Sequence, residues 1–157
     1  MAVDFDGVND YFHFPSSAFL DDMPALTFAA WVRFATFPEA SDRLWQKGAG
    51  AGATKLFEAV RSTTGMEFSI DFTGTNLVKR SSTNSVRLNR WDFWSVTWDG
   101  TTSASGVNIY RNGVLETVYV SSTDGTGTVS EIGSSGAVGA GVNATRDFDG
   151  QAEHIQV

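Results

Sequence analysis

The chain has 157 residues, a formal net charge of −7 and no cysteine. This length suits one domain and can bury a hydrophobic core without covalent support. The absence of cysteine excludes disulfides and thiolate chemistry, and an acidic surface repels phosphate backbones, so nucleic acid is not expected as a partner. No stretch approaches the roughly 20 apolar residues of a membrane span, so no membrane insertion is expected.

Apolar and polar residues alternate with a period of two along most of the chain, which is typical of β-strands. The longest strand is predicted at 26–34, where Phe28 and Val32 share one face while Trp31 and Arg33 share the other. A short helix is expected only at 16–20. The other predicted strands lie at 3–5, 11–14, 43–47, 54–62, 66–72, 75–80, 91–98, 107–111, 114–120 and at the C-terminal end.

Asn112 and Gly113, which separate two alternating runs, give the strongest local signal, because this pair favours a type I′ hairpin turn. The core is predicted to contain Phe28, Val32, Trp94, Val96 and Ile109. Segments 121–128 and 134–145 are rich in small residues that cannot fill a core, so they are expected to be surface loops. The many short strands predict an all-β, two-sheet antiparallel jelly-roll sandwich over residues 1–157.

Four segments carry a resemblance to a known family: DFDGVNDYF at 4–12, LTFAAWVR at 26–33, RWDFWSVTWDG at 90–100 with VNIYRNGV at 107–114, and FDGQAEHIQV at 148–157. In order and spacing they resemble the laminin-G-like jelly roll, in the concanavalin A-like group that includes pentraxins, glucanases and legume lectins. The resemblance implies that the closing strand returns beside the first. The family's functions are diverse, so the fold alone fixes none of them.

The resemblance also implies a calcium ion where the first and last strands meet. Oxygen ligands suit this hard cation. The opening turn would supply Asp6, the Gly7 carbonyl and Asp10, and the closing strand would supply Glu153, at a position where the family usually carries Asp. Alternatively, Asp6, Gly7 and Asp10 are ordinary turn residues, since Asp caps turns by accepting from nearby backbone N–H groups.

Aromatic residues outside the predicted core are candidates for ligand binding. Trp31 and Arg33 share one face of their strand, and Phe93 lies on the face of its strand opposite Trp94. Such a face suits stacking of sugar rings together with hydrogen bonds to hydroxyls. Alternatively, Trp31 covers one end of the sandwich or packs under a loop.

No catalytic residues are predicted. Related glucanases carry their acids on one strand as Glu-x-Asp-x-(x)-Glu, whereas here Glu67 and Asp71 stand without a third acid and the 91–98 strand holds only Asp92. The sequence therefore predicts a non-enzymatic, lectin-like binding module for glycans. The alternative is a structural surface protein, such as a virion decoration or tail component, that binds other subunits. A glycoside hydrolase is the least favoured function. No signal peptide is visible, so the chain is either part of something larger or needs no export signal, and an extracellular or virion surface is the favoured location.

Overall fold

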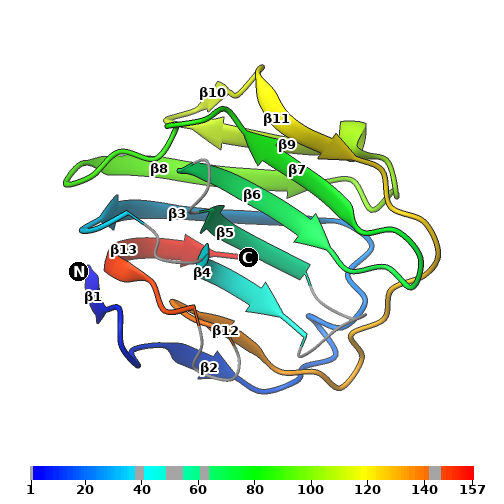
Figure 1. Cartoon of the computed structure of the whole chain (residues 1–157). Coiled ribbons are helices and arrows are strands. Elements are labelled where there is room, and N and C mark those ends of the chain that lie inside the picture. The colour runs from blue at the N-terminus through cyan, green and yellow to red at the C-terminus, as the bar shows by residue number, and fades with distance from the viewer. Residues whose placement is uncertain (1, 38–40, 49–54, 61–63, 142–145) are drawn as a thin grey trace.

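The computed structural model describes residues 2–37, 41–48, 55–60, 64–141 and 146–157, which form two stacked sheets of antiparallel strands (Figure 1). The predicted all-β jelly-roll sandwich is confirmed. Within the described ranges, the one helical element is a 3-10 turn, Ala104–Gly106. No helix in this part of the chain is long and apolar enough to cross a membrane.

One sheet places the first and last strands side by side, as predicted, because β1 pairs with β13. Their register sets Asp6 opposite Asp149 and Val3 opposite Ala152. Among the described residues this sheet has six strands, which run in the order β1 (Val3–Asp6), β13 (Asp149–Gln156), β3 (Leu26–Phe34), β8 (Trp91–Trp98), β9 (Val107–Arg111) and β10 (Val114–Leu115).

The second sheet lies over the first, with β11 near β10 at one edge of the sandwich and β2 near β1 at the other (Figure 1). It has seven strands within the described residues. They run in the order β11 (Tyr119–Thr123), β7 (Leu77–Ser81), β6 (Gly65–Ile70), β5 (Lys55–Val60), β4 (Ser41–Lys47), β12 (Gly136–Val138) and β2 (Phe12–Phe14).

The core between the sheets is rich in aromatic rings. Phe28 of β3 meets two rings of the opposite sheet, Trp45 at 6.1 Å and Phe57 at 5.5 Å between centroids. Every residue predicted in the core is at most 1% exposed: Phe28, Val32, Trp94, Val96 and Ile109. Because strand side chains alternate, this assignment turns Trp31 and Phe93 to the opposite face of the six-stranded sheet.

The predicted hairpin is present, since Asn112 and Gly113 have φ of 53° and 79° between β9 and β10. The single strand predicted at 114–120 is wrong, however. It contains β10, in the six-stranded sheet, and the first two residues of β11, in the seven-stranded sheet. The loop predicted at 121–128 is wrong in part, because β11 continues to Thr123. The chain crosses between the two sheets at Glu116, whose N–H still donates to the Ile109 carbonyl at 2.9 Å.

The loop predicted at 134–145 is also wrong in part, because it contains β12, which pairs with both β2 and β4. Small residues are needed at this position, where the chain threads between two strands under aromatic side chains. Ala137 is fully buried, and a Cβ at Gly136 would lie 2.1 Å from the Phe14 ring. Residues 142–145 of this prediction lie outside the described residues.

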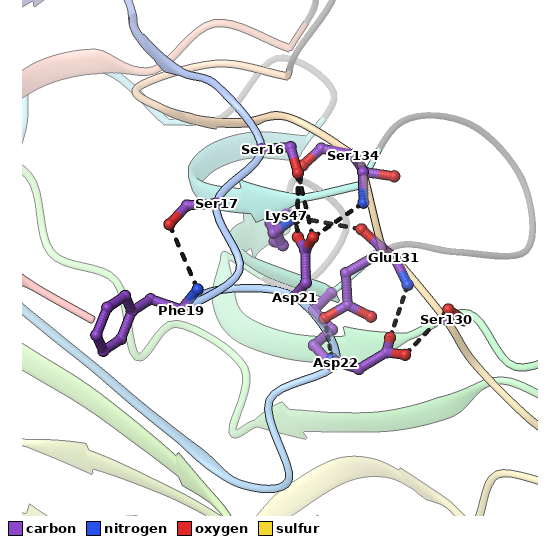
Figure 2. A network of polar contacts seen from close by, with 11 residues as sticks. Ser16, Ser17, Phe19, Asp21, Asp22, Lys47, Ser130, Glu131 and Ser134 are labelled. Atoms are coloured by element: carbon purple, nitrogen blue, oxygen red, sulfur yellow. Dashed lines mark hydrogen bonds and ion pairs between the residues drawn. The ribbon is translucent and has the colours of Figure 1, made fainter.

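The expected helix at 16–20 is a turn in which the N–H groups of Leu20 and Asp21 donate to the Ser17 carbonyl. A buried ionic network fixes this segment (Figure 2). The Lys47 ammonium donates to Asp21 at 2.8 Å, and Lys55 pairs with Glu131, with both lysines at most 1% exposed. Residues 16–22, which lead into β3, are therefore tied to the interior of the seven-stranded sheet.

Candidate functional site

The outer face of the six-stranded sheet carries an exposed aromatic patch. Trp31 of β3 lies opposite Phe93 of β8, with ring centroids 5.5 Å apart and planes tilted by 53°. The next outward pair is Arg33 opposite Trp91, and both Trp31 and Trp91 are 38% exposed. We call these four residues the aromatic face. The structure thus brings together the three residues predicted to bind ligand: Trp31, Arg33 and Phe93.

Polar side chains hold Arg33 in place beside the rings. Its guanidinium donates to Gln151 Oε1 at 3.3 Å from one side and to Asn89 Oδ1 at 3.1 Å from the other. Gln151 in turn donates to the carboxylate of Asp4. A surface on which rings and hydrogen-bonding groups are already positioned loses little entropy when it binds a ligand.

Trp91 was not predicted as part of the site, although the sequence carried the signal. It stands two residues before Phe93 in the same strand, so a period of two places both on one face. Its cross-strand partner, Arg33, could not be identified without the register of β3 against β8.

The predicted calcium ligands do not all come together, because Asp6, Gly7 and Asp10 share the opening turn while Glu153 lies elsewhere. The Asp10 carboxylate accepts from Asp6 N–H at 3.1 Å, and Asp6 Oδ1 accepts from Val8 N–H at 2.9 Å, so both carboxylates serve the opening turn. Glu153 lies opposite Trp31, four residues along β13 from Asp149, which is the partner of Asp6. The predicted proximity of Asp6 and Glu153 is therefore wrong, because it assumed a register shifted by four residues, or about 13 Å.

A pocket of about 420 Å³ does lie beside Asp6, at the end of the sandwich. Asp149 Oδ2 accepts from the Thr36 hydroxyl at 2.8 Å, while Asp147 Oδ1 is buried without a hydrogen-bond partner. Burial and the nearby Asp6 carboxylate raise the pKa of Asp147. Among the described residues, however, no group of three or more His, Cys, Asp or Glu is placed to hold a metal. The lining residues are Asp6, Gly7, Thr36, Asp42, Arg146, Asp147 and Asp149.

The outer face of the seven-stranded sheet differs, because four charged residues stand side by side on neighbouring strands. We call Arg43, Glu58, Glu67 and Arg80 the charged row. Arg80 Nε donates to Glu67 Oε2 at 2.5 Å, and Arg43 Nε lies 3.6 Å from Glu58 Oε2. Glu58 and Glu67 are only 5% and 7% exposed. The two carboxylates of the charged row are therefore shielded from solvent, whereas the Arg43 and Arg80 side chains are 16% and 25% exposed.

The two carboxylates of the charged row lie directly opposite each other, a pairing that places Cβ atoms about 5 Å apart. Burial raises the pKa of Glu67 against the opposing effect of the Arg80 guanidinium. The sequence analysis considered Glu67 as a possible catalytic acid. It missed the pair because it looked for a second acid on the same strand, and Glu58 is on the neighbouring strand. A carboxylate pair is one requirement of glycoside hydrolysis, and access of the sugar to both groups is another.

The sequence profile of the concanavalin A-like lectin/glucanases superfamily matches residues 6–157. The chain belongs to this superfamily. No curated protein matches it closely enough to count as a relative. The superfamily assignment agrees with the two-sheet architecture and with the pairing of the first and last strands.

Solved structures that share this superfamily's fold come from proteins with different functions. A sialidase of Trypanosoma rangeli is 14% identical with a TM-score of 0.63, over 97% of this chain and 24% of the sialidase. The carbohydrate-binding module CBM66 of Bacillus subtilis is 14% identical with a TM-score of 0.51, over 99% of this chain and 82% of the module. Botulinum neurotoxin type C, whose cell entry depends on two ganglioside molecules, is 11% identical with a TM-score of 0.54, over 96% of this chain and 38% of the toxin.

This chain thus spans about a quarter of the length of the sialidases it resembles. At such identities the likeness shows the fold alone. The neighbours include an enzyme as well as binding modules, so the function has to be argued from the chain's own side chains.

Proposed function

We propose that this chain is a non-catalytic carbohydrate-binding module whose ligand lies on the aromatic face. One observation carries the proposal: Trp31 and Phe93 form a half-exposed pair of rings on a rigid sheet, with Arg33 held beside them. A sugar ring presents apolar C–H groups to an aromatic surface and hydroxyls to its sides, which matches rings flanked by polar groups. The lectin-like fold and the carbohydrate-binding module among its structural neighbours support the proposal.

Calorimetry on a ligand found by glycan array tests this site. We expect Trp31→Ala and Phe93→Ala to weaken binding at least tenfold, or about 1.4 kcal/mol, because each removes a stacking surface. Phe19→Ala is the matched control, since this ring is 94% exposed and points away from the network in Figure 2. Unchanged binding by both site variants would contradict the proposal.

Binding of other protein subunits is the second candidate, and a separate observation favours it. Aliphatic side chains are exposed where β10 and β11 form neighbouring edges of the sandwich: Val114 by 70%, Leu115 by 40%, Val118 by 64% and Val120 by 47%. Exposed apolar groups on edge strands suit a protein contact. A glycan array without any bound sugar would favour this candidate over carbohydrate binding.

Calcium remains a prediction, now limited to the pocket beside Asp6. If the ion binds only the folded protein, calcium at 100 times its dissociation constant should stabilise the fold by about 2.7 kcal/mol. We expect EDTA to reverse the resulting rise in Tm and Asp6→Ala to abolish it. Glu153→Ala is the control that should leave the shift intact, because Glu153 lies away from this pocket. A Tm that calcium and EDTA both leave unchanged would rule the site out.

A further inference from the structure

The surface that carries the aromatic face continues along the same strands to a polar pocket. Outward side chains on β3, β8 and β9 form cross-strand rows. The row two residues along from the Trp31–Phe93 pair consists of Ala29, Ser95 and Tyr110. The next row, two residues further, consists of Thr27, Thr97 and Asn108. Each step of two residues advances about 7 Å, so the last row lies about 13 Å from the aromatic pair.

The last row forms part of a pocket of about 420 Å³. Its polar groups are hydroxyls, an amide and one carboxylate, contributed by Thr27, Thr97, Asp99, Ser105 and Asn108. This combination offers both donors and acceptors, as recognition of sugar hydroxyls requires. Asp99 is the only charged residue among those that line the pocket.

The pocket wall is rigid. Asp99 Oδ1 accepts from both the N–H and the hydroxyl of Thr101, at 3.0 and 2.8 Å. Gly106 allows the 3-10 turn to approach that carboxylate, because a Cβ there would lie 2.1 Å from Asp99 Oδ1. On the other side, Gly100 packs against the Pro24 carbonyl, at the end of the loop that the network in Figure 2 anchors.

Between the pocket and the aromatic pair, the middle row contains two small side chains. Ala29 and Ser95 have the shortest side chains of the three rows, and they lie opposite each other at the centre of the sheet. Ala29 is 7% exposed between its cross-strand partners Ser95 and Gln156. We call the strip of sheet surface that runs from Trp31 and Phe93 over Ala29 and Ser95 to the polar pocket the trough.

We infer that this trough binds an extended, neutral oligosaccharide, with one sugar stacked on Trp31 and Phe93 and a more distant sugar hydrogen-bonded in the pocket of Thr97 and Asn108. This inference rests on the proposed carbohydrate function and adds the length and charge of the ligand. The separation of about 13 Å requires more than one sugar unit. The aromatic face contributes one cation, Arg33, near the Glu153 carboxylate on the next strand, whereas the Asp99 carboxylate and the net charge of −7 oppose an acidic sugar.

Calorimetry with neutral gluco-, manno- and xylo-oligosaccharides of two to six units tests the inference, with 3′-sialyllactose as the acidic comparison. We expect affinity to rise with length for one neutral series. Thr97→Val and Asn108→Ala should weaken the longest member at least tenfold and leave the dimer nearly unaffected, whereas Trp31→Ala should weaken both. Thr97→Val keeps a β-branched side chain in the strand, and Thr123→Val on the exposed edge strand β11 is its matched control.

The outcomes separate this inference from the proposed function. Wild-type affinity of Thr97→Val and Asn108→Ala for the longest oligosaccharide, together with weak binding by Trp31→Ala, would overturn the trough and keep the aromatic site. Binding of 3′-sialyllactose at least tenfold tighter than any neutral oligosaccharide would overturn the assigned ligand class. Wild-type affinity of Trp31→Ala, or no binding of any sugar, would overturn the proposed function and the trough together.

Discussion

The two outer faces of the sandwich differ in how far their functional side chains are exposed to solvent. On the six-stranded sheet, Trp31 and Trp91 remain 38% exposed, and the Arg33 side chain lies opposite Trp91. On the seven-stranded sheet, Glu58 and Glu67 stand in the charged row at 5% and 7% exposure. Charged groups are the usual candidates for chemistry, yet here they are paired with one another and their carboxylates are shielded from solvent. The exposed outer face of the six-stranded sheet can therefore bind a ligand. The buried carboxylates on the outer face of the seven-stranded sheet affect the stability of the fold instead.

The largest expected effect contrasts the inner and outer sides of the six-stranded sheet. Trp94→Ala should destabilise the fold by about 3–5 kcal/mol, since it removes a side chain that is 1% exposed in the core. Trp31→Ala should cost no more than about 1 kcal/mol, because much of that ring already contacts water. Chemical denaturation monitored by circular dichroism measures both. Equal losses for the two variants would mean that Trp31 packs as a structural residue.

A smaller effect contrasts the arginines of the two outer faces. Arg80→Met should leave Glu67 buried next to Glu58 without its main partner. The expected loss is near the lower end of the roughly 3–5 kcal/mol typical of broken buried pairs, because the Arg80 side chain is 25% exposed. Arg33→Met should cost about 1 kcal/mol or less, as for other exposed polar contacts.

The same denaturation experiment checks this second contrast. A double variant, Arg80→Met with Glu67→Gln, serves as the control, because it removes the unpaired carboxylate and should recover part of the lost stability. If Arg80→Met is no more destabilising than Arg33→Met, water reaches the charged row, and the distinction between the two faces fails.

Sequence patterns predicted most strands of this fold because alternation is a local property. The 26–34 and 91–98 strands, the Asn112–Gly113 turn and the core residues were all readable from neighbours in the chain. The prediction failed where packing between distant segments decides the structure. Strand β12 consists of small residues that are buried only because β2 and β4 flank it. The split of 114–120 depends on where the chain crosses to the other sheet.

The candidate sites show the same distinction between local patterns, which were predictable, and pairing between distant segments, which was not. Alternation placed Trp31, Arg33 and Phe93 on outward faces, but only the register shows that Trp31 and Phe93 are directly opposite. The predicted partnership of Asp6 and Glu153 assumed a register that the β1–β13 ladder does not have. The pairing of Glu58 with Glu67 and the pocket of Thr27, Thr97 and Asn108 combine residues from different strands. No pattern within one segment could reveal them.

The last prediction is that the charged row has no glycosidase activity. Glu58 and Glu67 form a carboxylate pair, and the raised pKa of Glu67 is a property that a general acid needs. Hydrolysis also requires a glycosidic oxygen and an attacking group to reach both carboxylates, whereas these are at most 7% exposed and each has an arginine beside it. We therefore expect purified protein to show no turnover of β-glucans or sialosides by reducing-sugar and sialic-acid release. Sustained turnover that Glu67→Gln abolishes and Trp31→Ala leaves unchanged would make the charged row a catalytic site and reverse the roles assigned to the two faces.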